Sequence, residues 1–242
     1  MQQPVWLGES PDLFPPSQLA LTEPNGLLAV GGDLSPERLL NAYARGIFPW
    51  FNDDDPILWW TPDPRLVFRP ASIHVSKSLK KALRKTVHSV TIDQNFDEVI
   101  GHCSSLREGG TWISKDIIDA YNELNELGFA HSIEFRDEKG ALKGGFYGIG
   151  LGKVFFGESM FSLVPNASKM ALVHFANWAH LQGFKLIDGQ VENPHLVSLG
   201  ASAINRHQFE NELIEHCHPH IDDFQNIWDK TRGTTIGETV SQ

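Results

Sequence analysis

Residues 131–161 read HSIEFRDEKGALKGGFYGIGLGKVFFGESMF and contain the most regular pattern in the chain. Apolar and aromatic residues recur here in three runs, separated by two short segments that contain glycine and, in the first, charged residues. Such runs between turn signals predict β-strands. The predicted strands are residues 131–136, 141–149 and 153–161. Because short turns place consecutive strands side by side, we expect these three to pair as an antiparallel meander.

Regular elements continue on both sides of this meander. Downstream, Asn166 is predicted to cap a long apolar helix that ends before Gly183. Strand 185–191, a short helix at 194–199 and an amphipathic segment at 206–217 follow. Upstream, the pattern predicts a basic helix at 76–85, a strand at 87–92, and helices beginning near Asp93 or Asn95 and at Ser114.

This order of elements resembles the core of the GNAT acyltransferases. In that fold the last meander strand and the next strand separate, and the acyl donor binds in the cleft between them. The first 65 residues differ, since they hold ten of the 14 prolines and four of the seven tryptophans around one helix capped by Ser35. We therefore predict an α+β protein with a small irregular N-terminal domain (1–65) and a GNAT-like acyltransferase domain (66–242) with a mostly antiparallel sheet.

Composition limits the classes of function. The 242 residues carry 20 Lys+Arg and 30 Asp+Glu, so the formal charge is 20 − 30 = −10, and 41% of residues are hydrophobic. This balance is typical of a globular protein. The sequence shows no apolar run of about 20 residues that would cross a membrane, and no signal peptide at its start. Two cysteines form no disulfide framework, so we expect a cytoplasmic protein.

Positive charge is concentrated in one stretch. Residues 64–92 contain seven Lys and Arg and no acidic residue, so the rest of the chain carries −10 − 7 = −17. Such segregation favours a docking site for a polyanion, although a solvated helix face would show the same pattern. The candidate nucleic-acid contacts are Lys77, Lys80, Lys81, Arg84 and Lys85.

Three polar side chains interrupt apolar strands. Asp188 and Gln190 alternate with Gly189 and are predicted to share one strand face, where the carboxylate can hydrogen-bond the amide NH2 and polarise its carbonyl oxygen. An edge strand with polar groups in water is the alternative. Glu158 must be paired, solvated or functional, because burying a lone charge is costly. It is predicted to face the same cleft as Asp188.

Several aromatic residues are candidates for substrate contacts. Trp50 and Trp112 are predicted to lie on loops, where tryptophans either stack on nucleobases or pack against the protein. Phe146 and Phe155 either line an apolar pocket or belong to the core.

Other motifs are excluded. Residues 148–152 (GIGLG) have neither the spacing nor the following helix of a dinucleotide-binding loop, and they lack the pyrophosphate loop of coenzyme-A-dependent GNAT enzymes. Residues 216–220 (HCHPH) offer no fixed ligand geometry, so no metal and no cofactor are predicted.

Seven segments together resemble bacterial leucyl/phenylalanyl-tRNA–protein transferases. They are EPNGLLAVGGDLS (23–35), GIFPWF (46–51), WWTPDPR (59–65), GTWI (110–113), GESMFS (157–162), NASK (166–169) and LIDGQV (186–191). The resemblance runs in order from about residue 14 to about residue 205. It implies an enzyme that moves Leu or Phe, and less readily Met, from aminoacyl-tRNA to the N-terminal Arg or Lys of a protein. The product would be an N-degron, and the GNAT-like fold is the one assigned to this family.

The resemblance also implies roles for the candidate residues. Trp50 and Trp112 would contact the terminal adenosine, while Phe146, Phe155, Phe175 and Ile187 would line the side-chain pocket. Methionine occurs in this family at the position of Phe146. Asp188 would polarise Gln190, whose carbonyl oxygen would draw a proton from the attacking amine, or Gln190 would only orient the substrate.

Glu158 would bind the amine or the cationic N-terminal residue, and the basic helix would hold the tRNA acceptor stem. We expect a monomer without a membrane partner. An acyl-CoA-dependent GNAT transferase and a non-enzymatic tRNA-binding module are the two alternatives.

Overall fold

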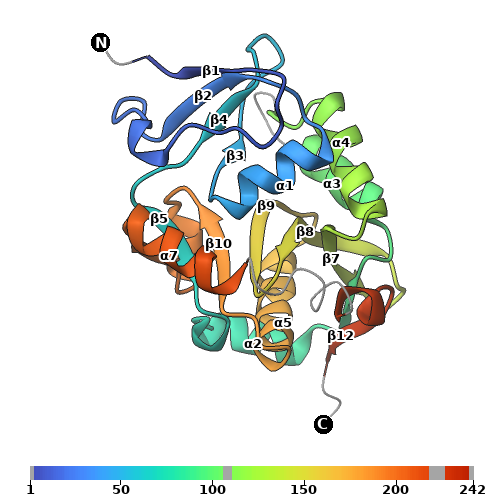
Figure 1. The fold of residues 1–242 in the computed structure, drawn as a ribbon. Helices are drawn as coiled ribbons and strands as arrows, with labels where there is room; N and C mark the ends of the chain where they lie inside the picture. Colours follow the sequence, from blue (N-terminus) through green and yellow to red (C-terminus); the bar gives the residue numbers. More distant parts are fainter. Residues whose placement is uncertain (1–2, 106–110, 218–226, 240–242) are drawn as a thin grey trace.

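Two β-sheets organise the chain (Figure 1). The structure is a computed structural model, and it describes residues 3–105, 111–217 and 227–239. The smaller sheet lies in the N-terminal part and has the order β1-β2-β4-β3. Its strands are β1 (Val5–Leu7), β2 (Leu27–Gly31), β3 (Phe48–Pro49) and β4 (Leu58–Trp60).

Helix α1 (Pro36–Ala44) begins where the sequence predicts, because the Ser35 hydroxyl accepts the Arg38 N–H. The sequence predicts an otherwise irregular N-terminal part, whereas the structure contains the four strands of the smaller sheet and a 3-10 turn at Ser17–Leu19. Strands of two to five residues are too short to show an alternating pattern, which explains the difference.

The larger sheet has eight strands in the order β11-β5-β10-β9-β8-β7-β6-β12. They are β5 (Arg65–Phe68), β6 (His88–Ile92), β7 (Ala130–Asp137), β8 (Leu142–Leu151), β9 (Val154–Ser162), β10 (Leu186–Gln190), β11 (Ser202–Ile204) and β12 (Thr235–Glu238). The meander β7-β8-β9 is antiparallel, as predicted. Every other pairing is antiparallel too, except that β9 and β10 run parallel.

Besides a helical segment at residues 227–231, six helices accompany this sheet within the described residues. They are α2 (Lys77–Lys85), α3 (Phe96–Ser105), α4 (Lys115–Glu126), α5 (Ala167–Leu181), α6 (Pro194–Ser198) and α7 (Arg206–His216), with a 3-10 turn at Pro70–Ser72. Ser76 and Ser114 cap α2 and α4 as predicted. Asn166 has φ +67° and makes no capping bond, and the Ser162 hydroxyl accepts the Ser168 N–H instead.

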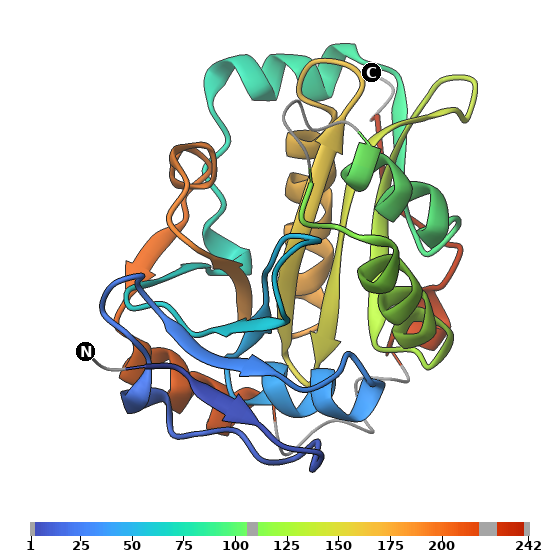
Figure 2. The same cartoon turned by 90° about the horizontal axis from the view of Figure 1, so that it is seen from above.

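The two faces of the larger sheet are covered by different helices (Figure 2). Side chains alternate along a strand, and neighbouring residues of β8 and β9 therefore enter different apolar clusters. Phe146 and Phe155 pack with residues of α5, whereas Tyr147 and Phe156 pack with residues of α1, α3 and α4. The core is thus divided by the sheet.

An opening in this sheet is built by β9 and β10. Their pairing starts at Val154 with Leu186 and stops at Phe156 with Asp188. Strand β9 continues to Ser162, but β10 bulges at its end, where Gln190 has φ +59°. The two strands therefore separate beyond Asp188.

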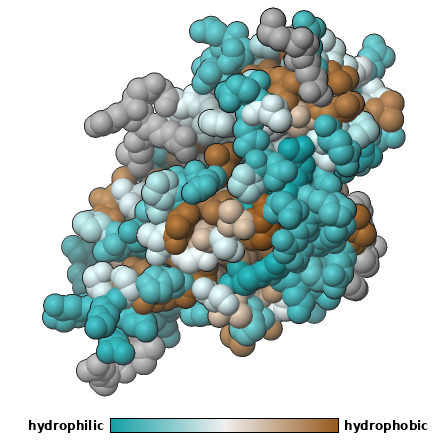
Figure 3. Space-filling model, turned by 90° about the vertical axis from the view of Figure 1, so that its left-hand side faces the viewer, coloured by the Kyte–Doolittle hydropathy of each residue, from teal (hydrophilic) through white to brown (hydrophobic). Residues whose placement is uncertain are grey.

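The outer surface is mixed in character. On the face drawn in Figure 3, apolar residues gather near the middle and hydrophilic residues surround them. Among the helices that the structure describes, none has the length and apolar character required to cross a membrane.

Candidate active site

A cavity of about 630 Å³ occupies the opening between β9 and β10. Its wall includes the end of β3 and the residue after it, the loop before α4, the start of α5 and the segment that follows β10. The charged residues on this wall, as far as the chain is described, are Glu158, Asp188 and Glu192, and no lysine or arginine lines it. Arg65 pairs with Asp188, so the negative character of the wall comes from Glu158 and Glu192, and it suits a cationic ligand group better than a phosphate.

One part of the wall is apolar. It is formed by Phe68, Phe146, Phe155, Leu172 and Ile187. The rings of Phe146 and Phe155 lie edge to face, with centroids 6.0 Å apart. This recess offers an apolar side chain a dry surface to contact.

Phe175 does not line the cavity. It is fully buried behind the recess, with its ring centroid 4.6 Å from that of Phe155 and 5.5 Å from that of Phe146. The family resemblance implies a lining residue at this position, and in the sequence an aromatic residue on an apolar helix looks the same whether it lines a pocket or lies behind it. Its contacts make it a support for the two rings in front of it.

Both candidate stacking tryptophans line the cavity. Trp50 is 43% exposed, and its backbone carbonyl accepts the Trp60 indole N–H at 2.6 Å. The ring centroids of Trp50 and Trp60 are 5.6 Å apart. Trp112 is only 9% exposed, so Trp50 offers the larger free ring surface.

Asp188 is fully buried and held by Arg65. The guanidinium donates to both carboxylate oxygens, at 2.9 and 2.6 Å, and to the carbonyl oxygen of Gly46 at 2.9 Å. It lies against the rings of Phe48 and Phe209, 4.8 and 4.6 Å from their centroids. A bidentate contact of this kind fixes the carboxylate in one orientation.

The contact between Asp188 and Gln190 differs from the predicted one. Asp188 accepts the backbone N–H of Gln190 at 2.9 Å, whereas the amide NH2 of Gln190 donates to Glu158 at 2.7 Å. The predicted bond from the Gln190 amide to Asp188 is therefore wrong. The bulge at the end of β10 is the reason, because the predicted shared face assumes regular alternation.

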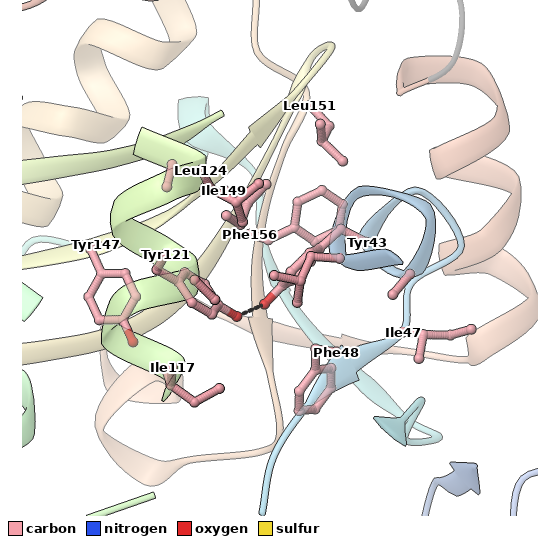
Figure 4. Packing of buried hydrophobic residues seen from close by; sticks show 14 of the residues in the cluster. Tyr43, Ile47, Phe48, Ile117, Tyr121, Leu124, Tyr147, Ile149, Leu151 and Phe156 are labelled. Atoms are coloured by element: carbon pink, nitrogen blue, oxygen red, sulfur yellow. Dashed lines mark hydrogen bonds between the residues drawn. The ribbon is translucent and has the colours of Figure 1, made fainter. Parts of the chain in front are cut away.

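Glu158 is the centre of a polar network. It accepts hydrogen bonds from the hydroxyls of Tyr43 at 2.7 Å and Tyr121 at 3.2 Å, besides the amide of Gln190. Tyr43 and Tyr121, from α1 and α4, are fully buried, and their hydroxyl oxygens also contact each other (Figure 4). The two hydroxyls supply two protons to these three contacts, so the contact between the tyrosines competes with their bonds to the Glu158 carboxylate. As predicted, Glu158 lies on the same cavity wall as Asp188.

The protein around Glu158 changes its acidity. Loss of hydration raises the pKa of the Glu158 carboxyl to about 7, although the hydrogen bonds from the two tyrosines act in the opposite direction. Burial raises the pKa of both Tyr43 and Tyr121 well above the usual value, so each keeps its proton.

Arg65, Tyr43 and Tyr121 are the functional candidates that the sequence did not single out. Tyr43 and Tyr121 stand on apolar helix faces, where they look like ordinary core residues. The sequence feature that could identify the two tyrosines is their hydroxyl group, because a buried phenol needs a hydrogen-bond partner. Arg65 is hidden in the basic stretch, and its side chain faces inward on β5 with only 1% exposed.

The basic side chains of α2 are all exposed: Lys77, Lys80, Lys81, Arg84 and Lys85. Within the described part of the chain none of them forms an ion pair. Leu79 anchors the helix from its buried side. Helix α2 lies at the end of the molecule opposite the smaller sheet, and none of its residues lines the cavity (Figures 1 and 2).

The histidine-rich segment 216–220 is only partly described. His216 lies near Glu212 and Glu215, and Cys217 is a buried free thiol, while residues 218–220 fall outside the described ranges. Among the described residues, no group of three or more His, Cys, Asp and Glu is arranged to hold a metal ion.

Comparisons with known proteins identify the family. The sequence model of the leucyl/phenylalanyl-tRNA protein transferase matches residues 67–214, and that of its N-terminal domain matches residues 32–63. A leucyl/phenylalanyl-tRNA–protein transferase of Hydrogenovibrio crunogenus is 53% identical over 222 residues, which cover 90% of this chain and 86% of that protein. One of Nitrosospira multiformis is 55% identical over 212 residues, covering 87% and 90%.

A solved structure of L-PGS from Bacillus licheniformis matches with a TM-score of 0.36 and 10% identity, over 83% of this chain and 64% of that one. A likeness this weak does not bear on the assignment. The sequence relatives do, because their identity extends over nearly the whole chain. This chain belongs to the leucyl/phenylalanyl-tRNA–protein transferase family.

Proposed function

We propose that the cavity between β9 and β10 is where an aminoacyl group passes from tRNA to the N-terminus of a protein. The chain is an aminoacyltransferase of its family. The donor would be Leu-tRNA or Phe-tRNA, and less readily Met-tRNA, and the acceptor a protein with N-terminal Arg or Lys. The product would carry an N-degron. The observation that carries this proposal is one cavity with an apolar recess beside the Glu158–Gln190 pair.

Aminoacyl transfer requires little besides the correct placement of the two reactants. The aminoacyl ester is already activated, so a peptide bond forms once an unprotonated amine reaches its carbonyl carbon in the correct direction. Holding both reactants in one site replaces a bimolecular encounter. Phe146, Phe155 and Ile187 would bind the donor side chain, with Phe175 supporting them from behind. The exposed ring of Trp50, with Trp112 on the same wall, would contact the terminal adenosine.

Gln190 and Asp188 act in different ways in this proposal. The side-chain nitrogen of Gln190 donates to Glu158, and this hydrogen bond fixes the orientation of the amide and therefore the position of its oxygen. That oxygen would accept an N–H from the attacking amine and orient it. Asp188 would act through Gln190, because it holds the backbone N–H of that residue. Glu158 would bind the amine from the other side, and the negative wall would favour a cationic N-terminal residue.

Helix α2 is proposed to bind the tRNA acceptor stem. Its exposed cations, which form no ion pair with any residue that the structure describes, suit a phosphate backbone, and their contacts would give salt-sensitive binding with little sequence preference. The helix lies away from the smaller sheet, where Trp50 follows β3. This separation suits a ligand that reaches the cavity with its end only.

The finer architecture is also a proposal. The separation of β9 from β10 after a meander supports a GNAT-like arrangement of residues 66–242. The separate smaller sheet, and family matches that meet between residues 63 and 67, support an N-terminal domain of residues 1–65. We place the protein in the cytoplasm, where aminoacyl-tRNA is made, and propose that it acts as a monomer.

Transfer of radiolabelled leucine and phenylalanine from charged tRNA to a peptide with N-terminal Arg tests the function. A peptide with N-terminal Ala is the matched acceptor control. Label on the Arg peptide alone is the expected result. Binding of tRNA without label on either peptide would instead favour a binding module, and acetyl transfer from acetyl-CoA would favour a coenzyme-A-dependent transferase.

A further inference from the structure

Glu158 has more contacts than a residue that only attracts a cation requires. Its carboxylate lies on the cavity wall, but both oxygens are held by donors from three other elements. Tyr43 comes from α1, Tyr121 from α4 and Gln190 from the end of β10. The carboxylate is thus fixed next to the group that would orient the amine.

We infer that Glu158 is the proton acceptor for the attacking amine and that Tyr43 and Tyr121 are its positioning residues. This inference rests on the proposed function and deepens it. A free α-amino group has a pKa of about 7.7–8.0, so at neutral pH most acceptor molecules arrive as ammonium and must lose a proton before they attack. The amide oxygen of Gln190 can orient an N–H but is a far weaker base than a carboxylate.

The reaction balances as follows. One ammonium proton moves to the Glu158 carboxylate, and the freed lone pair of the nitrogen forms the C–N bond at the ester carbonyl carbon. The tetrahedral intermediate then breaks its C–O bond to the ribose. A second nitrogen proton passes to the leaving ribose oxygen, which becomes a hydroxyl. The proton on Glu158 finally leaves to solvent, and the net products are the amide, the tRNA and one proton.

The surroundings of Glu158 match this task. A general base works best when its pKa lies near the working pH, and the pKa of Glu158 is about 7. The charged groups that face it are Asp188, which raises this pKa, and Arg65, which lowers it. Hydrogen bonds from the two tyrosine hydroxyls favour the carboxylate form and lower this pKa, against the effect of burial.

The first test separates proton transfer from binding. Glu158→Gln keeps the size of the side chain and a hydrogen-bond acceptor, but cannot take up a proton. We expect kcat for transfer to the Arg peptide to fall by about 100-fold or more, with smaller changes in KM for peptide and aminoacyl-tRNA. Glu123→Gln, on the exposed side of α4, is the matched control and should behave as the wild type. A rise in KM for the peptide with kcat preserved would overturn the inference.

The second test uses the pH dependence of single-turnover transfer at saturating substrates. In the wild type the rate should rise with pH through about 7, because the carboxylate is the active form. Tyr43→Phe and Tyr121→Phe each remove one donor to that carboxylate, which raises the pKa of Glu158. The acidic limb should then move upward by about one pH unit, with most of the rate recovered at higher pH.

A merely structural role of the tyrosines predicts a different result. It would lower the rate equally at all pH values, and it would appear as reduced stability in urea unfolding of the same variants. An acidic limb that stays in place in both variants, with the wild type active, would overturn the inference while leaving the proposed function intact. A wild type that fails to transfer label at any pH would refute the proposed function itself.

Discussion

Replacing Arg65 by alanine is expected to cost about 3–5 kcal/mol of the free energy of unfolding. The substitution removes two hydrogen bonds to the Asp188 carboxylate, at 2.9 and 2.6 Å, and one to the Gly46 carbonyl oxygen at 2.9 Å. It also leaves Asp188, with 0% of its surface exposed, as a buried charge without its cation. The three lost hydrogen bonds, at about 1 kcal/mol each, account for part of this cost, and the uncompensated buried charge accounts for the rest.

A double-mutant cycle in urea unfolding, followed by tryptophan fluorescence, measures this coupling. Asp188→Ala leaves Arg65 unpaired in the same way, so the double variant should lose less than the sum of the single losses by about 2 kcal/mol. Arg69→Ala is the matched control, because the Arg69–Glu212 pair is partly exposed and should contribute about 1 kcal/mol or less. A loss below about 1 kcal/mol for Arg65→Ala, or an additive cycle, would refute the reasoning.

Three further outcomes are expected. Changing Lys80, Lys81 and Arg84 to alanine should weaken tRNA binding and reduce its dependence on salt. The slope of log Kd against log salt concentration should fall by about 0.7–0.9 for each phosphate that is no longer neutralised. An unchanged slope in a filter-binding titration would contradict this prediction. Trp50→Ala should raise KM for aminoacyl-tRNA about tenfold with an unchanged Tm, because stacking on a base is worth about 1–3 kcal/mol. Phe146→Ala should enlarge the recess and favour Phe over Leu in competition assays, and an unchanged ratio would place the donor side chain elsewhere.

The meander of the larger sheet and the starts of its helices can be predicted from the sequence, because the sequence signals for turns and helix caps are local. A serine at the start of a helix, as at Ser76 and Ser114, acts within three residues, and the turns of the meander lie between strands of clear pattern. Strand β5 has no such signal. It has four residues and joins the sheet between β10 and β11, far away in the sequence.

The site was predictable in its residues but less so in their partners. Asp188, Gln190 and Glu158 attract attention because polar groups are rare in apolar strands. Their partners depend on a bulge and on side chains that arrive from other elements, as Arg65 does. Strand alternation alone does not predict these partners, because a single residue in the left-handed region redirects the chain.

The tyrosine pair on Glu158 has a consequence for how this chain can evolve or be engineered. Tyr43 comes from the segment before residue 65, yet it touches a carboxylate on β9 of the larger sheet. In the proposed mechanism the N-terminal segment would therefore contribute a side chain to the reaction centre. A chimera that takes its first 65 residues from another source would keep or lose the Tyr43 hydrogen bond, which is one of the contacts that lower the pKa of Glu158.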